Sequence, residues 1–250
     1  MENLLRFSFG NAKLPETTAI LDLPAGGTCP GARECLSRFN RQTRKIQDGK
    51  HTRFRCSAAM QETRPNVAAR RDYNFQLLMQ YHPGDLEGLI LASIDNSFMR
   101  KTTHMRWHNA GDVFSHRYAK AIVSTAEATP EITHYLYTKS LNLFVDLVLP
   151  SNLYLTASWG GRYDHLIEEG HFPRNSRVVF TEGEAAERGL PIDHDDTHAY
   201  TGMPHAFCHL VHGSQPKGSL AQQAITLRQK QGGFTGYGKA WKMTRLGKSK

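Results

Sequence analysis

The sequence predicts an α/β fold in which right-handed βαβ units form a parallel sheet, with either an open or a partial-barrel-like shape. Three observations support it. Strand-like and helix-like segments alternate over residues 102–212, 250 residues suffice for one large core, and no repeat or long linker divides the chain. We therefore expect a single α/β domain (1–250) with a cysteine-bearing, arginine-rich N-terminal portion (1–72), a parallel core (102–212) and a basic tail (239–250).

The elements follow from the spacing of apolar residues. Helical spacing is found at 75–79, 85–94 and 115–128, and Ser115 is the expected N-cap of the last of these. The run 133–138, rich in aromatic and β-branched residues, is the clearest strand. The other expected elements are strands at 105–109, 152–158, 177–181 and 205–212, and helices at 141–149, 163–169 and 220–230.

Polar side chains follow the predicted strands, at the edge where a parallel sheet usually binds its ligands. Because they come from successive loops, they predict a pocket at the C-terminal ends of the strands. The alternative is that residues such as Asp112 and Ser115 only cap helix N-termini. The predicted pocket comprises His108, Asn109, Asp112, Lys139, Trp159 and Arg162.

Positive charge is concentrated in two parts of the chain. The net charge is +8, and residues 32–72 hold eleven Lys and Arg against four Asp and Glu, while residues 239–250 add five bases and no acid. Such surpluses suit nucleic acid, because phosphates supply sequence-independent affinity. A solvated basic surface without a partner is the alternative. The predicted nucleic-acid contacts are Arg38, Arg41, Arg44, Lys45, Arg53, Arg55, Arg70, Arg71, Lys242 and Arg245.

Three of the four cysteines, Cys29, Cys35 and Cys56, lie in a segment rich in proline, glycine and arginine. Such a loop offers few apolar neighbours to bury a free thiol, so a bound metal is the favoured explanation. Cys208 is the expected fourth ligand, if the fold returns its strand to the N-terminal loop. Four thiolates predict a [4Fe-4S] cluster.

Zinc is the main alternative, although the spacing Cys-x5-Cys-x20-Cys lacks the short cysteine pairs of most zinc sites. Arginines beside the cysteines are expected to lower the pKa values of the thiols. If Cys208 is instead an ordinary core residue of its strand, the fourth coordination position of the metal is filled by a histidine or remains open. The arginines are Arg33, Arg53 and Arg55, and the candidate histidines are His51, His205, His209 and those of the loop 193–198.

Blocks of sequence along nearly the whole chain are similar to a known family. They are 23–29 (Leu-Pro-Ala-Gly-Gly-Thr-Cys) with its continuation to Cys35, 54–59, 106–112, 135–140, 212–219 and 236–238. Through these blocks the chain resembles the phage gene product 88 family, whose members come from phages and mobile elements. It also has a distant resemblance to radical-SAM proteins, which implies three cysteines holding a [4Fe-4S] cluster at the mouth of a partial barrel. The Cys-x3-Cys-x2-Cys spacing of those proteins is absent.

The remaining motifs restrict the function further. No P-loop, Gly-x-Ser-x-Gly or Gly-x-Gly-x-x-Gly motif is present. The loop 193–198 (Asp-His-Asp-Asp-Thr-His) is expected to be solvated, and a second metal on His194, Asp196 and His198 is the less favoured alternative.

The favoured function is a phage protein that binds a [4Fe-4S] cluster on Cys29, Cys35, Cys56 and Cys208 and contacts nucleic acid. One alternative is an iron–sulfur enzyme of radical-SAM-like ancestry, with its active site at the strand ends and an open iron position. Another is a zinc-stabilised interaction protein. The first residues lack the pattern of a secretory signal, and no apolar run approaches the ~18 residues of a membrane helix. The expected location is therefore the cytoplasm of the infected host cell.

Overall fold

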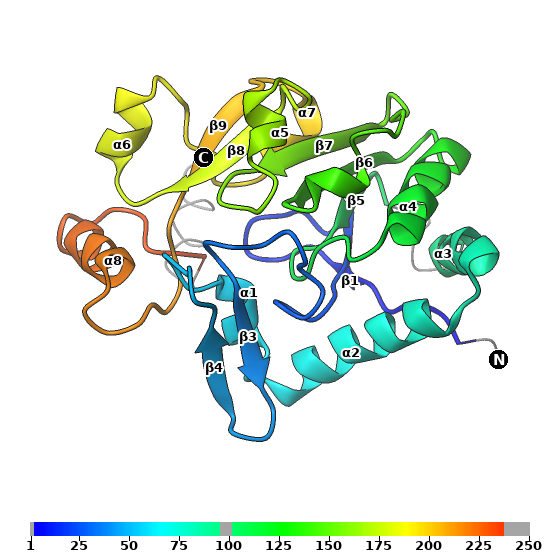
Figure 1. Cartoon of the computed structure of the whole chain (residues 1–250), viewed down its shortest axis with the longest axis horizontal. Coiled ribbons are helices and arrows are strands. Elements are labelled where there is room, and N and C mark those ends of the chain that lie inside the picture. Colours follow the sequence, from blue (N-terminus) through cyan, green and yellow to red (C-terminus); the bar gives the residue numbers. More distant parts are fainter. Residues whose placement is uncertain (1–2, 96–101, 238–250) are drawn as a thin grey trace.

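The computed structural model describes residues 3–95 and 102–237. Its main sheet has seven strands in the order β1-β2-β5-β6-β7-β8-β9. β1 is antiparallel to β2 and all later neighbours are parallel, which confirms the predicted α/β fold (Figure 1). The strands are β1 (Ser8–Phe9), β2 (Thr18–Leu21), β5 (His104–Trp107), β6 (Thr133–Thr138), β7 (Leu153–Ser158), β8 (Asn175–Val179) and β9 (Ala206–Leu210).

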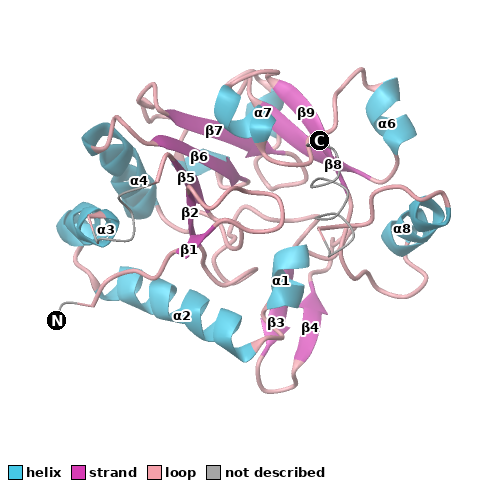
Figure 2. Ribbon diagram, turned by 180° about the vertical axis from the view of Figure 1, so that it is seen from behind, coloured by secondary structure: helices cyan, strands magenta, loops and turns pink. Residues whose placement is uncertain are grey.

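Helices surround the sheet, which is open rather than a closed barrel within the described residues. A separate antiparallel hairpin, β3 (Ser37–Asn40) with β4 (Lys45–Asp48), stands beside the start of α2 at the lower edge of the molecule (Figures 1 and 2). No helix of residues 3–95 or 102–237 is both long and apolar enough to cross a membrane. The helices are α1 (Ser57–Gln61), α2 (Pro65–Gln80), α3 (Leu86–Ile94), α4 (His116–Ala128), α5 (His165–Glu168), α6 (Glu182–Glu187), α7 (Thr197–Thr201) and α8 (Leu220–Lys230).

The two faces of the sheet differ in chemistry because successive side chains of a strand point to opposite sides. One row of paired residues across four strands belongs to the apolar core: Leu21, Trp107, Leu136 and Leu155. Helix α4 packs on this outer face, where the Tyr118 ring lies 6.5 Å from that of Trp107. The adjacent row, on the inner face, is Ile20, Arg106, Tyr135 and Tyr154. The inner face is therefore the polar and aromatic one.

Most elements predicted for the core are found at the expected positions. The strand 133–138 and the helix 220–230 have the predicted bounds, and the Ser115 side chain caps α4 by accepting from the Tyr118 backbone N–H at 3.4 Å. The helix expected at 141–149 is wrong, because only the 3₁₀ turn Leu141–Leu143 forms there. Only Asn142 and Asp146 are polar in this segment, and their spacing of four positions is compatible with a helix, so the local pattern does not reveal the irregular structure.

The N-terminal portion contains regular structure that its loop-like composition did not predict. β2 is fully buried and is the first parallel strand of the sheet. Its sequence, Thr-Ala-Ile-Leu, carried a weak strand signal. Because the loop after β2 leaves the C-terminal end of a parallel strand, the first two cysteines begin at the same edge as the predicted pocket.

Candidate functional site

A cavity of about 580 Å³ opens at the C-terminal ends of the parallel strands. Inner-face side chains such as Arg106 and Tyr137 form part of its wall, and loops after the strands form the rest. Arg162 is a correction to the predicted pocket, because its side chain is exposed and does not line the cavity. The other predicted pocket residues all line it: His108, Asn109, Asp112, Lys139 and Trp159.

Cys29, Cys35 and Cys56 line this same cavity. The first two lie on the loop after β2, and Cys56 is the N-cap residue of α1. Gly31 lets the loop pack against the end of β6, since a Cβ there would clash with the carbonyl of Lys139. The fold therefore brings together thiols that are separated by up to 27 positions in the sequence.

Burial raises the pKa of all three thiols. At Cys29 the negative charge of Asp112 adds to the effect of burial, and at Cys35 the pKa rises to about 11. Without a bound metal, these residues are therefore neutral thiols at neutral pH. Because metals bind thiolates, loading the site must release protons.

The expectation that neighbouring arginines lower these pKa values is wrong. The charges of two of them are balanced by ion pairs, Arg53 with Glu34 at 3.3 Å and Arg55 with Asp48 at 2.6 Å. Arg33 is exposed to solvent, which screens its charge. Desolvation of the thiols is the largest cause at each of the three sites.

Cys208 lies apart from the other three cysteines. It is completely buried between β8, β9 and α6, in an apolar cluster with Val179, Ala185 and Leu210. Its neighbours on β9, Phe207 and His209, face the Tyr137 ring on the inner face of the sheet. Strand alternation therefore directs the Cys208 side chain to the outer face, and the fourth-ligand prediction is corrected to an ordinary core thiol.

Within residues 3–95 and 102–237, no three His, Cys, Asp or Glu side chains form a group that could hold a metal ion as they are placed. The chemistry of the donors nevertheless fits an iron–sulfur cluster, since three half-buried thiols line one cavity. Cys29 and Cys35 lie on a loop, so cluster binding requires a local closure of this loop and of Cys56 around the metal. His209 lines the cavity as well, whereas His51 and His205 do not.

Asp112 organises the strand ends beside the thiols. Its buried carboxylate accepts hydrogen bonds from the Thr138 hydroxyl (2.6 Å), the Lys139 N–H (3.0 Å) and the Val113 N–H (2.7 Å). Burial raises its pKa, and these hydrogen bonds oppose the rise. Asp112 therefore joins the loop after β5 to the end of β6, and adds negative charge next to Cys29.

A second buried centre, which the sequence did not predict, lies on the inner face. The Asp196 carboxylate, 1 % exposed, forms ion pairs with Arg106 and with Lys13 Nζ (2.5 Å). The hydroxyls of Tyr135 (3.4 Å) and Tyr137 (3.3 Å) also donate to it. Burial opposes ionisation of Asp196, but Arg106 and Lys13 lower its pKa to about 2. The carboxylate is therefore charged at neutral pH.

This centre corrects the expectation of a solvated loop at 193–198. Both Asp193 and Asp196 are buried, and the Asp193 carboxylate accepts from the backbone N–H groups of Asp195 and His198. The available signal was Arg106, a charged residue in the middle of a predicted strand. A buried arginine requires a carboxylate, but the sequence pattern did not identify which one.

Arg71 is a correction among the predicted nucleic-acid contacts, because its side chain is only 1 % exposed. Its guanidinium donates to Glu62 Oε1 (3.0 Å) and to the carbonyl of Ala58 (2.8 Å), and lies 3.7 Å from the Asp22 carboxylate. It therefore joins α2 to α1 and to the loop after β2 instead of facing solvent.

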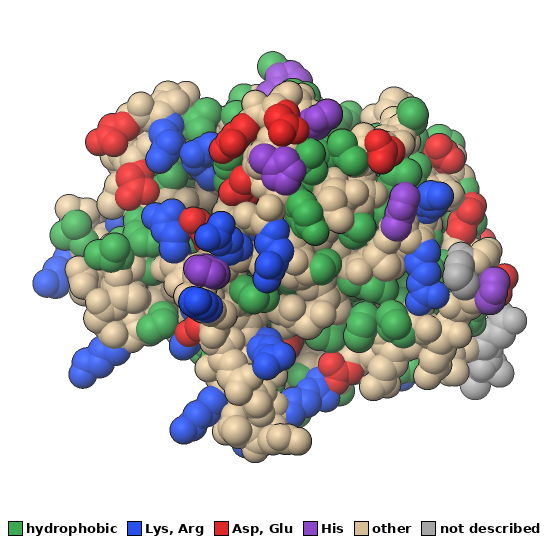
Figure 3. All heavy atoms as spheres, viewed as in Figure 1, with side chains coloured by type: hydrophobic (Ala, Val, Ile, Leu, Met, Phe, Trp, Pro, Cys, Tyr) green, Lys and Arg blue, Asp and Glu red, His purple; other side chains and the backbone are tan. Residues whose placement is uncertain are grey.

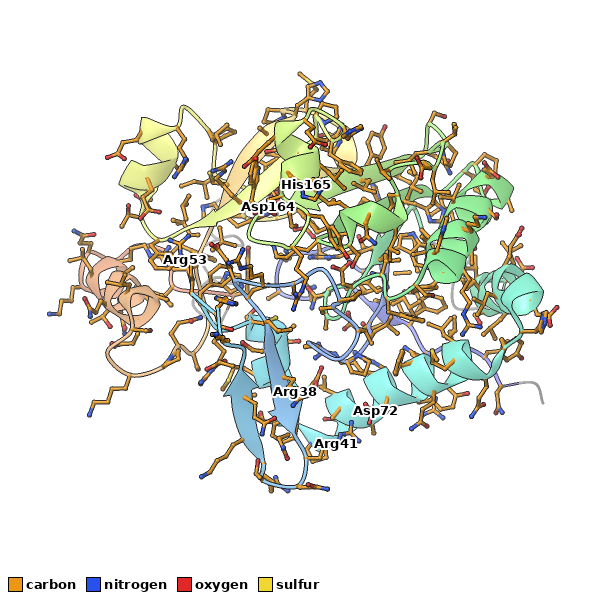
Figure 4. All side chains as sticks on the ribbon, in the orientation of Figure 1. Arg38, Arg41, Arg53, Asp72, Asp164 and His165 are labelled. Carbon is orange, nitrogen blue, oxygen red and sulfur yellow. The ribbon has the colours of Figure 1, made fainter. Side chains whose placement is uncertain are left out.

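The other predicted contacts differ in their partners, and Lys242 and Arg245 lie outside the described residues. Four bases form ion pairs: Arg41 with Asp72, Arg53 with Glu34, Arg55 with Asp48 and Arg70 with Asp22. Three predicted contacts are exposed and form no ion pair with the residues that the structure describes. They lie on the β3–β4 hairpin and are Arg38, Arg44 and Lys45. Figure 3 shows basic side chains along this lower edge, and Figure 4 shows Arg41 and Asp72 side by side next to Arg38.

A family model described as gene product 88 matches residues 3–231, which include the cysteine loops, the sheet and α8. The chain belongs to the gene product 88 family. This confirms the resemblance to the phage family that carries that name. No curated protein and no solved structure matched the chain.

Proposed function

We propose that this member of the phage gene product 88 family is an iron–sulfur enzyme, with a [4Fe-4S] cluster on Cys29, Cys35 and Cys56. The single observation that carries the proposal is that these three thiols line one cavity at the strand ends, while Cys208 is buried on the other face. It favours the enzyme over the four-cysteine alternative, since three protein thiolates leave one iron for another ligand.

The size and lining of the cavity support this proposal. When bound, the cluster supplies a redox or Lewis-acid centre. Asp112 and Lys139 hold the strand ends beside the thiols, and Lys139 Nζ donates to the carbonyl of Trp159. The volume of about 580 Å³ lies in the range of small-molecule sites. A substrate of that size can reach the wall that carries the cysteines.

The test is anaerobic reconstitution of the full chain with iron and sulfide, followed by metal and sulfide analysis and visible and electron paramagnetic resonance spectroscopy. We expect about four irons and four sulfides per chain. Replacing Cys29, Cys35 or Cys56 by Ala should reduce cluster content severalfold. Cys208→Ala is the matched control, and it should assemble the cluster normally.

Two results would contradict the proposal. Loss of the cluster in Cys208→Ala, with circular dichroism unchanged, would restore the four-cysteine site. A wild-type chain that binds one zinc and no sulfide would establish the zinc-stabilised alternative instead.

A second candidate function is contact with nucleic acid through the β3–β4 hairpin. The observation in its favour is the set of three exposed bases, Arg38, Arg44 and Lys45, which form no ion pair within the described residues. Exposed positive side chains on a hairpin can contact nucleic-acid phosphates directly, and such contacts do not involve the cysteines of the cavity.

A further inference from the structure

The β3–β4 hairpin is fixed at its base to the wall of the cavity. The Ser37 hydroxyl, at the start of β3, accepts a hydrogen bond from the backbone N–H of Cys56 at 3.3 Å. Gly26 packs against the same residue, since a Cβ on this glycine would lie 2.6 Å from the Ser37 carbonyl oxygen. Gly26 belongs to the loop after β2 that also carries Cys29. The hairpin therefore holds a defined position relative to the cavity cysteines.

The turn of the hairpin is joined to helix α2, which forms part of the cavity rim. Arg41, in this turn, donates to the carbonyl of Ala68 at 3.2 Å and pairs with Asp72 (Figure 4). Arg64, the N-cap residue of α2, lies one helical turn before Ala68 and lines the cavity. It is exposed and forms no ion pair with the residues that the structure describes. Exposed positive charge therefore continues from the turn, which also carries Arg44, to the cavity rim.

Arg70 extends the positive charge from the rim into the cavity. It lines the wall, and its side chain is 32 % exposed. Its carboxylate partner, Asp22, is 3.7 Å away, beyond hydrogen-bond distance, and lies equally far from Arg71. Asp22 therefore balances part of the charge of Arg70 but leaves its N–H donors available to a phosphate oxygen.

An aromatic side chain of the wall offers a surface for a nucleic-acid base. Phe54 is half-buried, lines the cavity and lies two positions before Cys56. Aromatic side chains stack on bases with little dependence on sequence. The cavity volume of about 580 Å³ lies in the range of small-molecule sites, so it can admit one nucleotide. A base within a duplex reaches such a cavity only after leaving the stack, which favours a single strand.

We propose that the cavity takes one nucleotide of a single-stranded nucleic acid, whose neighbouring phosphates contact Arg44, Arg64 and Arg70. The strand passes from the hairpin turn over the rim, and the inserted base stacks on Phe54 beside the cysteines. This inference rests on the proposed function in that the nucleotide is the substrate class of the same cavity. It goes beyond the second candidate function, which places nucleic acid on the hairpin alone.

The first experiment compares single and double strands on the full chain, before and after cluster reconstitution. The probes are labelled strands of about 12 nucleotides, within the range of single-strand binding sites. They are one DNA strand, the RNA strand of the same sequence and the DNA duplex, and fluorescence anisotropy gives each affinity. We expect at least one single strand to bind about tenfold more tightly than the duplex, because only a single strand adds a stacked base. The tighter of the two single strands identifies DNA or RNA.

The second experiment tests entry into the cavity. Iodoacetamide alkylates the thiols of the chain without cluster, and mass spectrometry measures the rate at each cysteine. The bound single strand should slow alkylation of Cys29, Cys35 and Cys56, whereas the duplex should not. Cys208, buried on the other face of the sheet, is the internal control, and its rate should not depend on the strand.

Variants then assign the contacts. Arg64→Gln should weaken single-strand binding and lower the slope of log affinity against log salt by about 0.7, the value for one phosphate contact. Arg188→Gln is the matched control, because Arg188 is also exposed but does not line the cavity, and it should leave the slope unchanged. Phe54→Leu should remove the preference for a single strand and leave duplex affinity unchanged, since Leu offers no ring for stacking.

Three results would overturn the inference: no single strand binds more tightly than the duplex, a bound strand leaves the three thiols unprotected, or Arg64→Gln and Arg188→Gln act equally. The proposed function is judged separately, from iron and sulfide content. A chain whose thiols are protected by the strand but which assembles no cluster refutes only the proposed function. A chain that assembles the cluster but shows no protection refutes only this inference.

Discussion

Two residues of the site, His108 and Asp196, have backbones in the left-handed region, with φ of 66° and 64°. Asp and His tolerate this region better than most residues, and such conformations persist where the surroundings hold them. Asp196 starts α7 but does not cap it with its side chain. The carboxylate instead pairs with Arg106 and Lys13. The left-handed backbone at Asp196 therefore occurs where the side chain forms ion pairs instead of a helix cap.

Asp196→Asn tests the network. Removing the carboxylate leaves Arg106 buried without its anion, so we expect the free energy of unfolding at pH 7 to fall by about 3–5 kcal/mol. Urea unfolding measures it. Asp146→Asn, at an exposed position, is the control and should change the value by less than about 0.5 kcal/mol.

The pH dependence of the same variant has a defined sign. The folded-state pKa of Asp196 is about 2, below the ordinary value of an aspartate. Its stabilising effect is therefore complete above the unfolded-state pKa and is lost as the pH falls through about 2. The difference in stability between wild type and Asp196→Asn should narrow as acid is added. A constant difference down to pH 2 would show that the charge is not the cause.

Helix starts illustrate what local sequence decides at the scale of an element. Three helices begin at a hydroxyl residue whose side chain accepts a hydrogen bond from the backbone N–H three positions later: Ser115 for α4, Thr181 for α6 and Ser219 for α8. Such caps depend on only a few adjacent residues. For this reason the start of α4 was predictable from sequence.

Ser115→Ala should lower the free energy of unfolding by about 1 kcal/mol, because one N–H of the first turn of α4 loses its acceptor. Thermal or urea unfolding provides the measurement. Ser124→Ala, within the same helix, is the control. It should leave stability unchanged or slightly raised, because Ala is the better helix former. Equal losses in both variants would argue against the cap.

The segment 141–149 is an element that local patterns misassigned. Its side chains Leu143, Val145, Leu147 and Leu149 pack against the core, as a helix there would, yet the chain runs without regular structure after residue 143. The apolar character of the segment was thus consistent with packing on the core, but its predicted helical structure was wrong. Contacts with the core, rather than helical hydrogen bonds, hold the segment.

At the scale of the whole molecule, two groups of bases stand out. One lines the cavity and ranges from buried (Arg71 and Arg106) to exposed (Arg64). The other is exposed on the β3–β4 hairpin. Composition alone does not separate the bases of residues 32–72 that line the cavity, such as Arg71, from those exposed on the hairpin, such as Arg38.

Replacing Arg38, Arg44 and Lys45 together by Gln tests the hairpin. The affinity for duplex DNA should fall, and the slope of log affinity against log salt should decrease by about 2–3, since each lost phosphate contact removes about 0.9. Fluorescence anisotropy across a salt series measures both. Lys120, Arg188 and Lys230, replaced together, remove the same charge from dispersed exposed sites. If that control reduces the slope equally, the hairpin has no special role.

The sequence by itself determined the parallel α/β core, the family, the Ser115 cap, the three cavity cysteines and most of the strand-end pocket. Each depends on local periodicity or local sequence motifs, or on the rule that parallel strands present their C-terminal ends at one edge. Only the tertiary structure decided that Cys208 faces away, that Arg71 is buried, and that Asp196 returns to Arg106 across the inner face. These outcomes depend on which face a strand residue occupies and on which distant loop covers it. The contacts of Asp196 with Tyr135 and Lys13 join residues 61 and 183 positions apart, and contacts at such separations produce no periodic pattern in the sequence.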